Sequence, residues 1–227
     1  MVAYARALSL RLAIAAWCGW LVSFADVAIG RQGHFASAVS ACAAEPAVAA
    51  NRRIGPFELT DVAGKSMTRD DWRAAKTVLL FFIGTECPAS NGYTPQMERI
   101  ARRYSLRGVQ CLGVHSDPTV TADAAAAHAK EYRLTFTILL DPAQTLAQAS
   151  GVRVTPEAVV ASSDGRVLYR GRIDNRYALD GKRRDEATQR DLEDALEAIL
   201  SGAEPPLRET KAFGCPLPKP RPGQDVN

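Results

Sequence analysis

The chain has 227 residues, of which 47% are hydrophobic and 23% are charged, and these fractions exclude a disordered or collagen-like protein. The length suits one domain of roughly 150 residues with extensions, or at most two small domains. Residues 1–42 carry three Arg against one Asp, so the net charge of +3 leaves 25 basic and 24 acidic residues in the remainder. Because this balance lacks the positive charge of a nucleic-acid-binding protein, we expect no nucleic-acid partner.

The N-terminal segment has the pattern of an export signal. Arg6 and Arg11 precede a mostly apolar run at residues 12–24, which is typical of a signal peptide and short for a membrane span. Extension of the run to residue 29 would allow an uncleaved anchor, and the VSAC sequence that ends at Cys42 resembles a bacterial lipidation signal. We predict that residues 1–42 are a signal peptide or membrane anchor, and that the exported protein meets a membrane only through them.

After a linker at residues 43–52, the pattern of apolar residues predicts alternating strands and helices. Strands are expected at 57–61, 77–83, 109–115, 136–140, 157–161 and 166–169. A short helix is expected to begin at residue 70, and further helices are expected at 91–107, 122–132, 143–149 and 185–200. The order predicts an α/β domain at residues 53–201, with a central mixed β-sheet, parallel at first and then a hairpin, flanked by helices on both faces. The Pro-rich C-terminal tail, residues 202–227, is expected to be extended and mobile.

The five cysteines are widely spaced, with no CxxC pair and no tight Cys/His cluster, so we expect no structural metal site and no disulfide scaffold. Cys18 lies in the export segment, and Cys111 lies in a predicted buried strand. Both are therefore expected to be unreactive apolar residues. The remaining cysteines are Cys42, Cys87 and Cys215.

Cys87 lies at the turn between a predicted buried strand and the helix that follows it. At a helix N-terminus, free N–H groups and the helix macrodipole stabilise a thiolate. Pro88 suits the first helical turn, and Pro95 interrupts the helix eight residues after Cys87. Further along the chain, Thr155-Pro156 precedes a predicted strand, which suits a cis-proline turn. The pattern favours a reactive Cys87 over an inert buried cysteine.

These motifs, in this order, resemble the thioredoxin-like superfamily, specifically its redoxin branch of alkyl hydroperoxide reductase, thiol-specific antioxidant and other peroxiredoxin-related proteins. The resemblance covers residues 53–201. It implies a thioredoxin-like fold in which Cys87 is the nucleophile, Pro156 is the cis-proline beside it, and backbone groups of Thr155 and Pro156 hold an extended partner peptide. The implied partners are protein or small-molecule disulfides, peroxides and an external thiol reductant, and no cofactor is implied.

The chain departs from two signatures of this superfamily. Ser90 stands where a thioredoxin has its second cysteine, so it could donate a hydrogen bond to the thiolate but could not resolve an intermediate. Peroxiredoxins carry Thr or Ser three residues before the nucleophile and Pro seven before, where this chain has Gly84 and Leu80, although Thr85 lies one place nearer. Disulfides and peroxides therefore both remain candidate substrates.

Two non-enzymatic alternatives also remain open. A copper-binding module would draw on Cys87 and on His115, which ends a predicted strand near Asp117. A redox-inactive scaffold would leave the pKa of the Cys87 thiol at or above about 8.5.

Cys215 is a candidate for the second thiol that a one-cysteine site needs. It lies about 15 residues beyond the last predicted helix, and an extended segment of that length reaches at most roughly 50 Å. A domain of this size has a radius of gyration of about 15 Å, so the tail can span it. We hypothesise that Cys215 forms a disulfide with Cys87 during turnover, within the chain or across a dimer. The alternative is that its cysteine is incidental.

Overall fold

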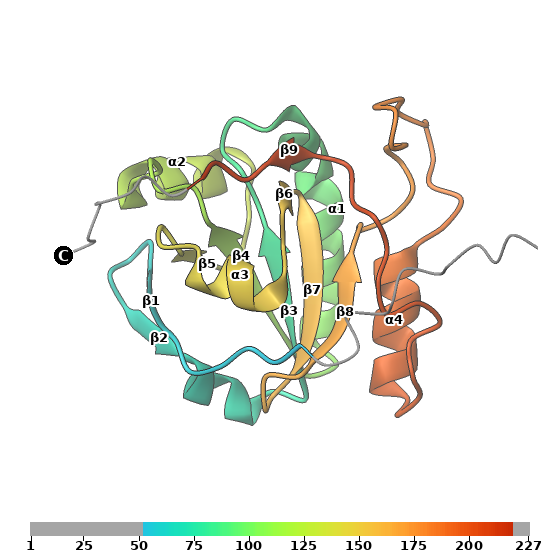
Figure 1. The fold of residues 1–227 in the computed structure, drawn as a ribbon, viewed down its shortest axis with the longest axis horizontal. Helices are drawn as coiled ribbons and strands as arrows, with labels where there is room; N and C mark the ends of the chain where they lie inside the picture. The colour runs from blue at the N-terminus through green and yellow to red at the C-terminus, as the bar shows by residue number, and fades with distance from the viewer. Residues whose placement is uncertain (1–51, 220–227) are drawn as a thin grey trace, which may run out of the picture. The chain divides into compact units, whose positions relative to one another are not determined.

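The computed structural model describes residues 52–219 (Figure 1). The predicted signal or anchor segment, with Cys18 and Cys42, and nearly all of the predicted linker lie outside the described residues. No helix within residues 52–219 is long and apolar enough to cross a membrane. The elements in chain order are β1 (Glu58–Asp61), β2 (Ser66–Thr68), the 3-10 helix η2 (Arg69–Ala74), β3 (Thr77–Phe82), α1 (Pro88–Ser105), β4 (Val109–His115), α2 (Ala122–Glu131), β5 (Thr137–Leu140), α3 (Thr145–Ser150), β6 (Val154–Thr155), β7 (Glu157–Ser162), β8 (Val167–Gly171), α4 (Asp191–Leu200) and β9 (Cys215–Pro216).

The main sheet is mixed, as the sequence predicts. Its seven strands follow the order β2-β1-β5-β4-β3-β7-β8. The central strands β3, β4 and β5 are parallel, whereas β7 runs antiparallel to β3 and forms a hairpin with β8. At this hairpin Gly165 has φ of +88°, a conformation that favours glycine. The predicted α/β class with a mixed central sheet is confirmed.

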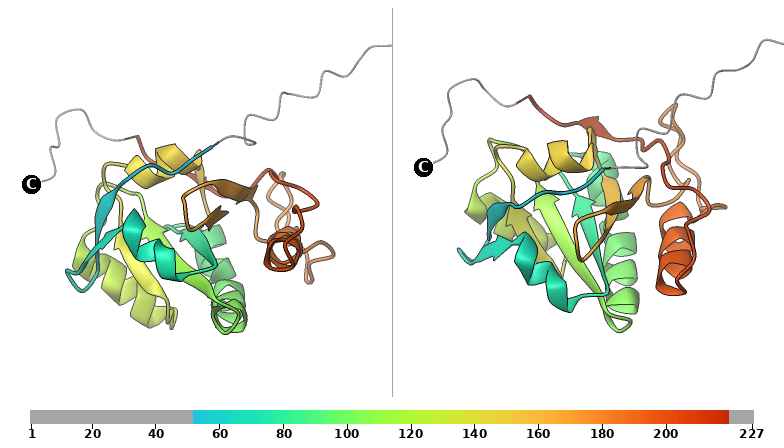
Figure 2. Two further views of the ribbon diagram at one scale, coloured as in Figure 1. Left: turned by 90° about the horizontal axis from the view of Figure 1, so that it is seen from below. Right: turned by 60° about the horizontal axis from the view of Figure 1, so that its bottom comes forward.

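Helices cover both faces of the sheet, as seen from two further directions in Figure 2. Strand β3 is buried throughout, and its successive side chains point to opposite faces. Leu79 and Phe81 join the core that α1, α2 and α4 cover. Leu80 and Phe82 join the core beneath η2 and α3. The uninterrupted apolar run of β3 therefore reflects a strand between two hydrophobic layers.

Helix α1 begins at Pro88, three residues earlier than the sequence predicts, and continues through Pro95 to Ser105. Proline has no N–H, so the carbonyl of Asn91, four residues before Pro95, loses its helical partner. The hydroxyl of Thr94 donates to that carbonyl at 2.8 Å and replaces the missing hydrogen bond. The helix can thus begin directly after Cys87 and still carry a proline in its second turn.

The last helix is shorter than predicted, because α4 begins at Asp191 and not at residue 185. The side chain of Asn175 accounts for the difference. Its Oδ1 accepts hydrogen bonds from the backbone N–H groups of Thr188 (2.8 Å) and Gln189 (3.0 Å). These contacts hold the preceding residues in a loop that packs beside the sheet edge.

The C-terminal segment is not the free tail that the sequence predicts. Residues 208–219, which we call the strap, run back across the domain, and Figure 1 shows β9 beside β6. Strand β9 pairs antiparallel with β6, so that Thr155 lies opposite Cys215. The backbone N–H of Leu217 donates to the carbonyl of Arg153 at 2.9 Å. The expectation of a mobile tail is wrong for this part of the chain.

Alternation of prolines in the strap explains why a Pro-rich sequence can still pair as a strand. Leu217 uses its N–H for pairing, whereas Pro216 and Pro218, which have none, occupy the alternate positions. In an edge strand, alternate N–H groups point away from the partner strand, so proline there removes no inter-strand hydrogen bond. The proline count therefore indicates an extended segment but does not determine whether it is docked.

Replacement of Trp72, which is fully buried and packs on Phe57 with ring centroids 5.1 Å apart, is expected to destabilise the fold strongly. We predict that Trp72→Ala lowers the free energy of unfolding by about 3–5 kcal/mol, because it removes a large buried side chain and leaves a cavity. Chemical denaturation followed by circular dichroism measures this. Leu106→Ala is the control, since Leu106 is 91% exposed and its loss should change stability by at most about 0.5 kcal/mol.

Candidate active site

Cys87 is the N-cap residue of α1 and is buried, with 4% of its surface exposed. Its thiol donates a hydrogen bond to the carbonyl of Thr155 at 3.0 Å. Its sulfur also accepts from the backbone N–H of Ser90 at 3.5 Å. The thiol therefore lies between an N–H of the first helical turn that donates to its sulfur and a carbonyl that accepts its hydrogen bond.

The Thr155–Pro156 peptide bond is cis, as the sequence predicts. Thr155 also lies close to the loop before Cys87, since a Cβ at Gly84 would approach the Thr155 side-chain oxygen to 2.9 Å. The structure thus brings Cys87, Thr155 and Pro156 together from two segments separated by more than sixty residues of chain.

Ser90 takes part in the site through its backbone. Its side-chain oxygen accepts a hydrogen bond from the N–H of Gly84 at 3.1 Å, which closes the loop before Cys87. The contact to the Cys87 sulfur comes from the Ser90 N–H. The expected hydrogen bond from the Ser90 hydroxyl to the thiolate is therefore replaced by one from its backbone amide.

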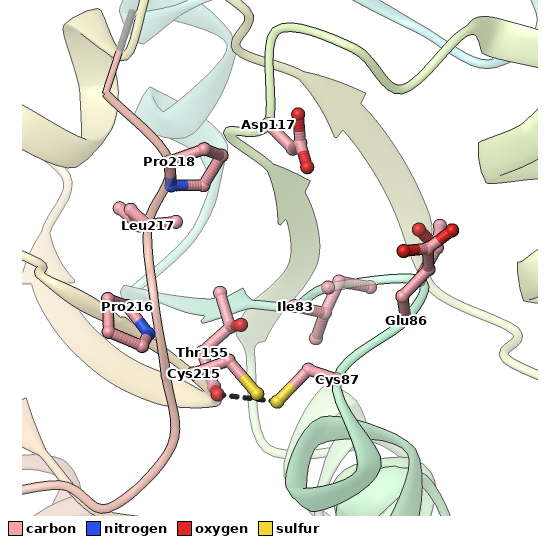
Figure 3. Close-up of a pocket in the computed structure, with 11 residues that line it drawn as sticks. Ile83, Glu86, Cys87, Asp117, Thr155, Cys215, Pro216, Leu217 and Pro218 are labelled. Carbon is pink, nitrogen blue, oxygen red and sulfur yellow. Dashed lines mark hydrogen bonds between the residues drawn. The ribbon is translucent and has the colours of Figure 1, made fainter.

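Cys215 faces Cys87 across the site. Figure 3 shows the two sulfur atoms pointing toward each other, with Cys215 on the strap and Cys87 at the start of α1. Both cysteines are free thiols. The structure therefore places next to each other the two cysteines that the sequence suggested as a pair, 128 positions apart.

The two thiols have opposite pKa shifts. Burial raises the pKa of Cys87, but hydrogen bonds from the Cys215 thiol and from the N–H groups of Ser90 and Cys215 outweigh it, so the pKa of Cys87 is below its ordinary value. Burial, together with donation to Cys87 and repulsion from its charge, raises the pKa of Cys215 to about 11. As the pH rises, Cys87 therefore loses its proton before Cys215 does.

A cavity of about 160 Å³ opens onto the two cysteines. The loop before Cys87 forms one wall, and the strap residues Pro216, Leu217 and Pro218 form another. Glu86 and Asp117 are the charged side chains among its lining residues, which include no Lys or Arg within the described part of the chain. The sequence analysis named Asp117 only as a residue near His115, and it did not suggest that strap residues line the site.

A hydrogen-bonded layer behind the site also escaped the sequence analysis. The ring nitrogen Nε2 of His128, on α2, lies 2.9 Å from Oδ1 of Asn91, on α1. The amide of Asn91 donates to the carbonyl of Thr85 at 2.9 Å. This chain of contacts fixes the loop that precedes Cys87. Residues so far apart in sequence offer no spacing pattern that could have indicated it.

His115, the residue considered for copper binding, is absent from the residues that line the cavity at Cys87. Its ring packs against His128 with centroids 5.3 Å apart, and burial lowers the pKa of His115 to about 4. Within residues 52–219, no group of three or more His, Cys, Asp or Glu side chains is arranged to hold a metal ion. Cys87 and His115 therefore do not form a common ligand set in the described structure.

Removal of the Cys215 thiol should raise the pKa of Cys87, because the thiolate loses a hydrogen-bond donor. We predict that the pH midpoint of Cys87 alkylation lies below that of an ordinary thiol in the reduced protein and moves to higher pH in Cys215→Ala. Mass-resolved iodoacetamide labelling against pH measures it. Cys111→Ala should leave the midpoint unchanged, since burial raises the pKa of Cys111 to about 12 and that thiol lies outside the cavity. An unmoved midpoint in Cys215→Ala would contradict the prediction.

Comparison with known proteins places the chain in a family. The family model for the AhpC/TSA family matches residues 50–170. The thiol-disulfide oxidoreductase ResA of Bacillus thuringiensis subsp. konkukian (strain 97-27) is 29% identical over 113 residues, which cover 49% of this chain and 63% of ResA. Chloroplastic peroxiredoxin Q of Triticum aestivum is 29% identical over 115 residues, which cover 50% of this chain and 49% of that protein. The match thus spans less than two thirds of each of these curated relatives.

A solved structure extends the similarity over most of the described fold. The crystal structure of a hypothetical protein from Sinorhizobium meliloti 1021 superposes with a TM-score of 0.65 at 26% identity, and covers 74% of this chain and 92% of that one. The superposition reaches beyond the stretch that the family model matches. The chain has a thioredoxin-like fold and belongs to the AhpC/TSA family.

Proposed function

We propose that the protein is a thiol–disulfide oxidoreductase whose redox pair is Cys87 and Cys215. The observation that carries the proposal is the juxtaposition of two free thiols, one with a lowered pKa and one with a raised pKa. A nucleophile with a lowered pKa beside a protonated second thiol is the arrangement that thiol–disulfide exchange requires. Similarity to a relative named thiol-disulfide oxidoreductase supports the same activity.

In the first step, the Cys87 thiolate attacks one sulfur of a substrate disulfide. A bond forms between Cys87 and that sulfur, the substrate S–S bond breaks, and the other substrate sulfur leaves as a thiolate. The Ser90 N–H and the N-terminus of α1 stabilise the attacking thiolate in the free protein. The same two groups stabilise Cys87 as the leaving thiolate when the reaction runs in the reverse direction.

In the second step, Cys215 resolves the mixed disulfide. The Cys215 thiol passes its proton to the departing thiolate and its sulfur attacks the Cys87 sulfur, which forms the Cys87–Cys215 disulfide and releases the second substrate thiol. The net reaction oxidises the protein dithiol and reduces one substrate disulfide to two thiols. An external thiol reductant restores the dithiol.

A peroxidase reaction is the second candidate, favoured by the small cavity at Cys87 and by the similarity to peroxiredoxin Q. In that case Cys87 would take one oxygen from a hydroperoxide and become a sulfenic acid, with an alcohol as the other product. Attack by Cys215 would then form the same disulfide and release water. The absence of Lys and Arg among the described residues lining the cavity favours disulfide exchange, because no cationic side chain there would polarise a peroxide oxygen.

One equivalent of oxidant should therefore produce a Cys87–Cys215 disulfide within a single chain. We predict this bond by non-reducing peptide mapping after treatment of the reduced protein with diamide or 2-hydroxyethyl disulfide. Cys87→Ser should lose activity in both a 2-hydroxyethyl disulfide reduction assay and a peroxidase assay, and Cys215→Ser should accumulate a Cys87 mixed disulfide. Cys111→Ser is the matched control and should behave as the wild type. A Cys215 that stays free in the oxidised wild-type protein would refute the pairing.

We also propose that the protein works outside the cytoplasm, since residues 1–42 have the pattern of an export signal or anchor. An oxidising compartment would suit a protein that cycles between a dithiol and a disulfide. In a bacterial host that produces the full chain, we predict recovery in the periplasmic or membrane fraction. Replacement of Arg6 and Arg11 by Glu should retain the protein in the cytoplasm. Cytoplasmic recovery of the unaltered chain would contradict the proposal.

A further inference from the structure

The strap occupies the backbone edge at which an extended peptide would meet Cys87. Strand β6 pairs with β9, and the register places Val154 opposite Pro216 and Thr155 opposite Cys215. Extended peptides bind a strand edge by main-chain hydrogen bonds, so an occupied edge offers them nothing to pair with. The Cys215 thiol already lies where the cysteine of such a peptide would have to lie.

The strap is held on both sides of Cys215. On its N-terminal side, the N–H of Thr210 donates to the carbonyl of Arg170 at 3.0 Å, and Phe213 stacks on Tyr177 with centroids 6.1 Å apart and an interplanar angle of 10°. On its C-terminal side, the side-chain amide of Gln144 donates to the carbonyl of Pro218. A segment fixed at both ends is not displaced merely by fraying of the chain terminus.

The backbone of the strap approaches β6 most closely at Gly214. A Cβ built there would lie 2.6 Å from the carbonyl carbon of Thr155 and 3.0 Å from the nitrogen of Pro156. These are backbone atoms, which cannot move aside as a flexible side chain can. Any side chain at position 214 must therefore push the strap away from β6, and the absence of one lets Cys215 reach Cys87.

With the strap in place, Cys87 is 4% exposed, and the cavity of about 160 Å³ gives small reactants a route to it. We infer that the strap selects substrates by size, so that the docked protein reacts with low-molecular-weight disulfides and excludes extended peptides from Cys87. The inference rests on the proposed disulfide exchange at Cys87. Release of the strap would open the β6 edge to peptides and would at the same time remove the resolving thiol.

Two probes with the same leaving group test the inference. Both are mixed disulfides of 5-thio-2-nitrobenzoate. In the small probe its partner is 2-mercaptoethanol, and in the peptide probe its partner is the central cysteine of an uncharged decapeptide. Attack by reduced Cys87 forms a mixed disulfide with the probe and releases the coloured thiolate. We expect the wild type to react with the small probe about tenfold or more faster than with the peptide, because the strap blocks backbone pairing.

Gly214→Ala should largely remove this preference. We expect the ratio of the peptide rate to the small-probe rate to rise about tenfold, since the strap leaves β6 and exposes its edge. The pKa of Cys87 should rise when Cys215 moves away from it. This rise slows both probes alike, because both react with Cys87, and it therefore cancels in the ratio of the two rates. Gly55→Ala is the matched control: a Cβ at Gly55 meets nothing within 4 Å, and its ratio should equal that of the wild type.

Hydrogen exchange of the strap amides reports whether the strap has separated from β6. The double variant Gly214→Ala/Phe213→Ala also lacks the stacking on Tyr177, so its strap should be fully released. An unchanged ratio in a variant whose strap exchanges freely would overturn the inference. Equal rates of the wild type with both probes would overturn it as well. Failure of the wild type to react with the small probe would instead refute the proposed function.

Discussion

The pairing of β9 with β6 is the interaction on which the candidate site depends. It places Thr155 opposite Cys215 and so brings the strap cysteine to the sulfur of Cys87. The same pairing supplies the wall of the cavity formed by Pro216 and Leu217. Without it, Cys87 would be a single cysteine at a helix start, with no second thiol beside it among the described residues.

The pKa of Cys87 results from competition between burial and hydrogen bonding. Burial disfavours the thiolate and is the largest individual influence on the pKa of Cys87. Donors from the strap and from the first turn of α1 together exceed it. Because the strongest influence that lowers this pKa comes from Cys215, the docked strap would, in the proposed reaction, both activate the nucleophile and hold the thiol that resolves its product. Strap docking and thiolate formation are therefore coupled.

The surroundings of the strap show how an extended segment becomes a fixed part of the domain. The loop between β8 and α4 supplies Tyr177, which stacks on Phe213, and the edge of β8 supplies the carbonyl of Arg170. Asn175 anchors that loop by accepting two backbone hydrogen bonds, and this is also why α4 starts later than its apolar pattern suggests. The shortened helix and the docked strap therefore depend on the same loop.

Local sequence by itself determined the α/β class, the buried central strands, the position of Cys87 at a helix start and the Thr155-Pro156 turn. Each of these follows from hydrophobic periodicity or from the backbone chemistry of proline within a short window. It also indicated Cys215 as a possible partner, because the reach of a tail can be calculated from its length. Docking of the strap, the backbone origin of the Ser90 contact and the layer formed by His128, Asn91 and Thr85 came only from the tertiary structure. These features depend on atoms that are far apart in the chain and meet only when the sheet and helices have packed.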